Sequence, residues 1–100
     1  MIKIENKQTS VLGREETLFN YSGLIESCCN YVNQATGVSS SDQLKRLKIL
    51  SKIDGISCGG TIELEDAEFN DLLRLESGMA WGMVHRDIGE FTKYLNSLKK

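Results

Sequence analysis

The sequence predicts one α+β domain over residues 1–100, in which a small two-stranded β-ribbon packs on three to four helices. Two short stretches alternate apolar and polar residues, as half-buried strands do. Elsewhere, apolar residues recur every three or four positions, which is typical of amphipathic helices. The length suits a single domain, and an apolar fraction of 40% with a charged fraction of 26% is ordinary for a globular protein.

The N-terminal third predicts a strand followed by a helix. Residues 1–5 alternate apolar and charged side chains and predict the strand, while residues 11–13 are either a second extended piece or a loop. An apolar stripe at helical spacing then runs over 14–33. Because Gly23 weakens a helix by about 1 kcal/mol relative to alanine, we expect the firm part over 21–32.

The middle of the chain predicts a second helix and a second strand. The Ser-Ser-Ser-Asp run at 39–42 can accept the unpaired amide hydrogens of a helix that runs over 42–54 and stops at Gly55. Residues 61–65 alternate again and predict a strand that pairs with the first one. The side chains that we expect this helix to bury are Leu44, Leu47, Leu50 and Ile53.

The remainder, from residue 66 onward, reads as helical, with two apolar stripes that are out of phase. The change of phase falls in 77–82, so we expect a kink or break there, with Asp87 as a possible new N-cap. The first stripe comprises Phe69, Leu72, Leu73, Met79 or Ala80, and Met83. The second comprises Trp81, Val84, Ile88, Phe91, Leu95 and Leu98, with Tyr94 beside it.

The second stripe is the expected partner-binding surface. A stripe of this kind is either part of the domain core or the contact face of a helix-mediated oligomer or partner groove. We take the second interpretation as the working hypothesis. The residues assigned to partner binding are Trp81, Val84, Ile88, Phe91, Tyr94 and Leu95.

Two charged clusters offer other contact surfaces. The acidic one is either a solvated helix face or a docking face formed by Glu65, Glu68 and Asp71. The basic one consists of Lys45, Arg46, Lys48 and Lys52, and with the two aspartates of the segment it gives helix 42–54 a net charge of +2. The whole chain has a net charge of −2, so the residues outside this helix carry −4. These four residues are the alternative nucleic-acid contacts. We expect their charges to spread around the exposed face of the helix.

No motif predicts a catalytic residue, a cofactor or a metal site. His85-Arg86-Asp87 has the letters of the kinase catalytic triplet, but the glycine loop and lysine of a kinase are missing. The glycine-rich segment 55–61 leads into a strand instead of out of one and lacks the phosphate-binding lysine. We expect one of Cys28 and Cys29 to be buried and the other half-exposed.

The cysteine count and the hydropathy bear on location. Three cysteines do not form a secreted disulfide framework, so we expect reduced thiols. The N-terminus lacks the apolar run of a signal peptide, and no stretch approaches the roughly 18 apolar residues of a membrane span. We therefore expect a cytoplasmic protein without a membrane partner.

Parts of the sequence resemble small orphan accessory proteins of tailed bacteriophages and prophages. The matching residues are Ile62, Leu64, Glu65, Asp66 and Phe69, then Met79, Trp81, Gly82, Ile88 and Phe91, with the earlier segments 12–16 and 21–26. The resemblance implies an accessory role in particle assembly or in binding a host protein, and a place in the host cytoplasm or the virion.

Taken together, these features predict a non-enzymatic protein-interaction module that binds a protein partner or itself as a homo-oligomer. The alternative is a nucleic-acid-binding regulator that uses the basic helix 42–54.

Overall fold

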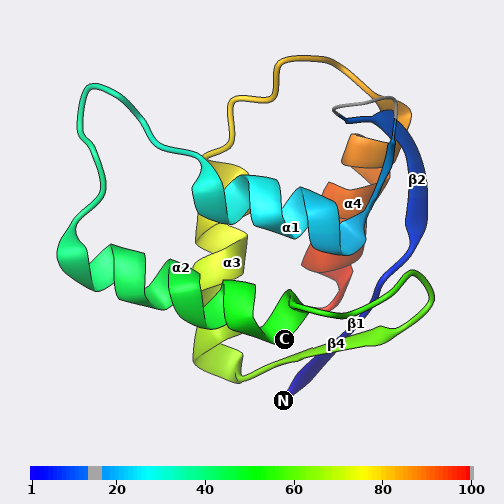
Figure 1. Ribbon diagram of the computed structural model, residues 1–100, viewed down its shortest axis with the longest axis horizontal. Helices are drawn as coiled ribbons and strands as arrows, with labels where there is room; N and C mark the ends of the chain where they lie inside the picture. Colours follow the sequence, from blue (N-terminus) through cyan, green and yellow to red (C-terminus); the bar gives the residue numbers. More distant parts are fainter. Residues whose placement is uncertain (14–16, 100) are drawn as a thin grey trace.

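The computed structural model describes residues 1–13 and 17–99, and these form four helices and two small antiparallel sheets (Figure 1). This confirms the predicted α+β class. The elements in chain order are β1 (Ile2–Glu5), β2 (Gln8–Leu12), β3 (Leu18–Asn20), α1 (Tyr21–Asn30), α2 (Ser40–Ile53), β4 (Thr61–Leu64), α3 (Asp66–Ser77) and α4 (Arg86–Ser97).

The first sheet is the predicted ribbon. Strands β1 and β4 pair antiparallel, with Ile2 opposite Leu64 and Ile4 opposite Ile62. These four side chains share one face and are buried, while the residues between them are exposed. A two-stranded ribbon is marginal by itself in water, so its stability depends on the helices that cover this apolar face.

The second sheet replaces the first part of the predicted helix 14–33. Strand β3 pairs with β2, and α1 begins only at Tyr21 because the Asn20 side chain accepts a hydrogen bond from the Gly23 amide at 3.0 Å. The helical prediction is thus wrong for 17–20 and, after the end of α1, for 31–33, and its residues 14–16 lie outside the described part of the chain. A Cβ at Gly23 would lie 2.6 Å from Cδ1 of Phe19, so this glycine admits the Phe19 ring.

A buried asparagine holds the ribbon to α1. The Asn6 amide group donates to the carbonyl oxygens of Ile56 and Ser57 at 3.3 and 3.1 Å. Its side-chain oxygen accepts from the amide of Ser22 at 2.8 Å. Asn6 is fully buried, so each of these bonds satisfies a group that water does not reach.

The core lies where the four helices meet the ribbon. In Figure 1, α1 crosses in front of α3, with α4 beside them and β1 and β4 below. The radius of gyration is 13.0 Å, as expected for a compact chain of this length. The most deeply buried apolar side chains are Ile4, Leu24, Ile25, Cys28, Ile49, Ile62, Leu64, Leu72, Phe91 and Leu95.

The predicted break in the C-terminal helical region is confirmed. Helix α3 ends at Ser77 and α4 begins at Arg86, with an irregular connection between them. The N-cap of α4 is His85, whose Nδ1 accepts from the amide of Asp87 at 3.0 Å. Asp87 is therefore not the N-cap but lies in the first turn, where a carboxylate also suits the helix dipole.

Helix α2 begins as predicted and buries Ile53 as expected, but two of the other expected core residues are exposed. The Ser39 hydroxyl caps it by accepting from the Asp42 amide at 3.2 Å. Leu44 and Leu47, which we expected to be buried, are 64% and 57% exposed, whereas Ile49 and Ile53 are buried. No helix among residues 1–13 and 17–99 combines the length and the apolar character needed to cross a bilayer.

Candidate functional site

Half of the predicted partner-binding stripe lies in the core. Ile88, Phe91 and Leu95 are buried on the inner face of α4, and the Phe91 ring makes an edge-to-face contact with Tyr21 at a centroid distance of 5.0 Å. A partner can reach these side chains only if α4 separates from the core. The assignment of Ile88, Phe91 and Leu95 to partner binding is therefore wrong.

The other residues of that stripe do not form one surface. Trp81 and Val84 belong to the α3–α4 connection, where Trp81 packs partly on the core and Val84 is fully exposed. Tyr94 has partners within the chain, because its hydroxyl accepts from the Glu5 amide at 3.0 Å and the Lys7 ammonium lies 4.5 Å from its ring centre. Trp81 and Val84 continue the heptad spacing of α4 into a segment that is not helical. The sequence therefore predicted a longer stripe than the structure contains.

The acidic residues of the predicted docking face mainly serve helix α3. Glu65 is its N-cap, and a side-chain oxygen of Glu68 accepts from the Glu65 amide at 2.8 Å in a capping box. Glu68 also lies 3.9 Å from the ammonium of Lys52. Asp71 is half-buried one turn further along α3. The Glu65–Glu68 spacing was the signal for a cap.

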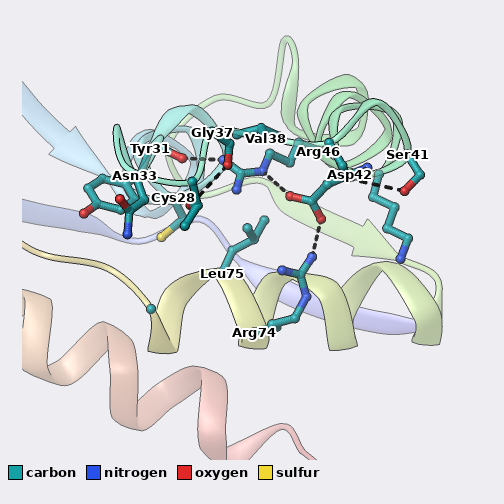
Figure 2. A pocket seen from close by; sticks show the side chains of 14 residues that line it. Cys28, Tyr31, Asn33, Gly37, Val38, Ser41, Asp42, Arg46, Arg74 and Leu75 are labelled. Atoms are coloured by element: carbon teal, nitrogen blue, oxygen red, sulfur yellow. Dashed lines mark hydrogen bonds and ion pairs between the residues drawn. The ribbon is translucent and has the colours of Figure 1, made fainter.

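One of the four basic residues on α2 points inward. Arg46 pairs with Asp42 at 2.9 Å, and its Nη1 donates to the carbonyl oxygens of Cys29 and Tyr31 at the end of α1. The other oxygen of Asp42 accepts from Arg74 of α3 at 2.6 Å (Figure 2). This network joins three helices, and it supplies the cation that the last turn of α1 lacks.

The two arginines also stabilise the ionised form of Asp42. Burial would raise its pKa, but the hydrogen bonds from Arg46 and Arg74 outweigh that effect and hold the pKa below the ordinary value of 3.8. The i, i+4 spacing of Asp42 and Arg46 was visible in the sequence. Arg74, 32 residues beyond Asp42, gave no such signal.

A polar pocket of about 530 Å³ opens beside this network, between the end of α1, the start of α2 and α3 (Figure 2). Its charged lining comprises Lys45, Arg46 and Arg74 against Asp42, a net charge of +2. Three of these four groups already bond one another, so they brace the helix junction. The uncharged polar side chains on the wall are Tyr31, Asn33, Thr36, Ser39 and Ser41.

The cysteines near this junction are poor nucleophiles. Cys28 and Cys29 are both buried, so the expectation that one would be half-exposed is wrong. Burial raises the pKa of Cys28, and it raises the pKa of Cys29 to about 11. Both therefore stay protonated near neutral pH. Cys58 is exposed and reduced.

A serine, an aspartate and a histidine meet at the start of α4, but they do not form a catalytic triad. The Ser10 hydroxyl donates directly to Asp87 at 2.7 Å, and the Ser10 amide donates to the same oxygen at 2.8 Å. His85 accepts from the Asp87 backbone instead of receiving the serine proton. These bonds tie β2 to the start of α4 and lower the pKa of Asp87. In the part of the chain that the structure covers, no group of three or more His, Cys, Asp or Glu residues is arranged to hold a metal ion.

The three lysines of α2 form a single stripe, not the spread that we expected. Lys45, Lys48 and Lys52 follow one another at i, i+3 and i+7 on one helix, which places them on one flank. Lys52 pairs with Glu68. Within residues 1–13 and 17–99, neither Lys45 nor Lys48 forms an ion pair.

Beside this lysine flank lies an exposed apolar surface, which we call the outer face of α2. It consists of Leu44 and Leu47 with Val32, which is 40% exposed in the loop after α1. A hollow of about 280 Å³ adjoins it, lined by residues that include Val32, Val38, Leu47 and Leu50. The core does not use this surface.

A second hollow, of about 590 Å³, continues along the same side of α2. The two hollows share Asn30, Leu47 and Leu50, so together they form one groove between α1 and α2. Glu26 and Asp54 line its far part. This groove was not predicted from the sequence, because Leu44, Leu47 and Leu50 were all expected to lie in the core.

Comparisons with known proteins add no relative: no family model matches the chain, and no curated protein or solved structure gives a significant match.

Proposed function

We propose that this protein is a non-enzymatic protein-interaction module that docks a segment of a partner protein on the outer face of α2 and in the α1–α2 groove. The observation that carries the proposal is the exposure of Leu44 and Leu47 beside a hollow whose lining is partly apolar. Single exposed leucines are common, but two on adjacent turns next to a hollow match a helix-in-groove site.

The energy available at this surface is adequate for a modest interaction. Complete burial of a leucine side chain contributes about 1.5–3 kcal/mol. Covering the exposed parts of Leu44, Leu47 and Val32 contributes a share of this free energy for each side chain. The entropy cost of ordering the partner is subtracted from the sum. A partner therefore gains affinity mainly by covering these three side chains.

The resemblance to phage accessory proteins suggests the setting of this interaction. In that setting the partner is a host protein or another component of the particle, and a second copy of the chain is the remaining candidate. In each case the outer face of α2 is the surface that we propose to be covered.

A second candidate function, nucleic-acid binding, is favoured by one observation. Lys45 and Lys48 are exposed on one flank of α2, where they could follow a phosphate backbone. A gel shift that weakens with salt and is lost in the Lys45→Glu, Lys48→Glu double variant would support it. The absence of a shift at low salt would remove it.

The test of the docking function compares two double variants. Leu44→Lys with Leu47→Lys places charge on the outer face of α2, and Met83→Lys with Val84→Lys makes the same change on exposed residues of the α3–α4 connection. Each protein is immobilised, and the proteins retained from a lysate of the source cells are quantified by mass spectrometry. We expect the α2 variant to lose partners that the wild type and the connection variant both retain.

Hydrogen exchange supplies the second readout. A retained partner should slow amide exchange in α2 and in the loop that contains Val32, and leave the α3–α4 connection unchanged. Partners that bind the α2 variant as well as they bind the wild type would contradict the proposed function. Circular dichroism of both variants confirms that each is folded.

A further inference from the structure

We infer that the docked segment is an amphipathic helix with carboxylates along one side of its apolar stripe; this rests on the proposed function and specifies its partner. The juxtaposition that supports the inference is an apolar stripe at Leu44 and Leu47 with a row of lysines directly beside it.

The shape of the surface suits a helix. Leu44 and Leu47 lie at i and i+3, so they form a ridge parallel to the axis of α2. The groove with α1 runs along the same side of that ridge and reaches residues at both ends of α2, from Gln43 to Asp54. Helix α2 has 14 residues, about 21 Å at 1.5 Å per residue, so a partner helix of about four turns covers it.

The charges on the two sides of the ridge differ in sign. Lys48 is one turn beyond Leu44, and Lys45 is one turn before Lys48, so both ammonium groups lie on the side away from the groove. On the groove side, Arg46 lines the near part but is already paired with Asp42, and the charged groups at the far end are Glu26 and Asp54. A partner helix therefore meets a basic border on one side and, on the other, two carboxylates at the far end of the groove.

This asymmetry predicts both the charge and the direction of the partner. Carboxylates beside Lys45 and Lys48 gain attraction on one side, and the opposite side of the partner favours neutral or basic residues near Glu26 and Asp54. A partner helix with one acidic side satisfies this arrangement in only one of its two directions along α2. Charge pairs at such a rim set direction and association rate more than total affinity.

A second copy of the chain fits this surface less well in its simplest arrangement. A two-fold axis that makes two α2 helices antiparallel brings the same flank of each copy together, so lysines face lysines. The exposed apolar side chains also form a strip only one helix wide, whereas a stable dimer buries about 800 Å² on each partner. Figure 1 shows α2 at the margin of the molecule, where a separate helix can approach it.

The experiment uses three synthetic helical peptides with the same apolar stripe. One carries glutamates along one side of the stripe, the second carries lysines there, and the third carries glutamines. Binding to the full chain is measured by fluorescence anisotropy at low and at high salt. We expect the glutamate peptide to bind about tenfold more tightly than the glutamine peptide at low salt, with the difference shrinking at high salt.

Charge reversal in the protein makes the test specific. In the Lys45→Glu, Lys48→Glu variant the preference should change from the glutamate peptide to the lysine peptide. The matched control, Lys93→Glu with Lys99→Glu, reverses two exposed lysines of the C-terminal region and should leave the preference unchanged. Equal binding of the three peptides, or a preference of the wild type for lysine, overturns the inference.

The failure of this inference is distinguishable from failure of the docking function. Suppose that the three peptides bind equally and that Leu44→Lys with Leu47→Lys abolishes this binding. The docking function on the apolar surface then stands, and only the acidic character of the partner is wrong. If light scattering shows that the wild type is a dimer and that the same leucine variant is a monomer, the surface binds a second copy of the chain instead. A salt-sensitive gel shift with nucleic acid, together with no peptide binding, overturns the inference in favour of the basic helix as a nucleic-acid site.

Discussion

Helices α4 and α2 each carry an apolar stripe whose position in the structure is the reverse of the one that the sequence predicted. We expected the stripe of α4 to face a partner, and its central residues Ile88, Phe91 and Leu95 are in the core. We expected Leu44 and Leu47 of α2 to be in the core, and they face solvent. Apolar periodicity thus identifies a helix and its stripe, but not what covers that stripe.

The reason for the difference is the number of stripes on each helix. Helix α4 has one apolar stripe, so that stripe packs inward. Helix α2 has two, one with Ile49 and Ile53 and one with Leu44 and Leu47, and only one can face the core. Arg46 lies on the isoleucine side and bonds the end of α1, so the network with Asp42 favours this rotation of α2.

The largest expected effect comes from the inner face of α4. Phe91→Ala removes a fully buried ring that contacts Tyr21, and the loss of burial together with the cavity left behind should lower the free energy of unfolding by about 3–5 kcal/mol. Urea unfolding followed by circular dichroism measures the change. A loss below about 1 kcal/mol would mean that α4 is not a core element.

The inner side of α2 should show the next largest effect. Arg46→Met keeps an unbranched aliphatic stem but leaves the carbonyl oxygens of Cys29 and Tyr31 and one oxygen of Asp42 without their charged donor. Since hydrogen bonds to charged groups contribute about 1.5–3 kcal/mol, we expect a loss of about 2 kcal/mol in the free energy of unfolding. Arg74→Met, at a more exposed site, is the control and should cost less than about 1 kcal/mol.

The same network predicts a dependence of stability on pH. The pKa of Asp42 is lower in the folded chain than in the unfolded chain, so its contribution is complete above the ordinary pKa and is lost as the pH falls below about 4. Urea midpoints of the wild type and of Asp42→Asn should therefore converge as the pH is lowered through this range. A difference between the two proteins that stays constant with pH would show that the charge of Asp42 does not stabilise the fold.

The smallest effect on stability should come from the outer face of α2. Leu44→Ala removes an exposed side chain from a helix and substitutes the residue with the best helix propensity, so we expect a change within about 0.5 kcal/mol. Thermal unfolding of the Leu44→Ala and Phe91→Ala variants, measured side by side, compares the loss of stability in the two helices. A large loss for Leu44→Ala would show that this side chain stabilises the fold and would weaken the docking assignment.

Local sequence signals predicted most of the elements. The alternation in 1–5 and 61–65 identified the ribbon, and the serines before Asp42 identified the start of α2. Such signals are local because a strand pattern or a cap depends on residues within a few positions. The α2 lysines were also identified from the sequence as a basic cluster.

The candidate site could be predicted only in part. The lysines were found, but the leucines beside them were assigned to the core, and the Arg74 partner of Asp42 was not foreseen. Asn6, which directly follows the predicted strand 1–5, is buried and bonds residues 50 and 51 positions away. These features depend on which segments meet, and residue spacing within one segment carries no such information.

The amino-acid sequence by itself determined the α+β class, the pairing partner of the first strand, the start of α2 and the break before α4, because each follows from short-range periodicity and capping. Only the tertiary structure decided which apolar stripe of α2 faces the core and that the α4 stripe is sealed inside. The physical reason is that burial is a competition among all apolar surfaces of the chain for a limited interior, and its outcome depends on contacts between distant segments.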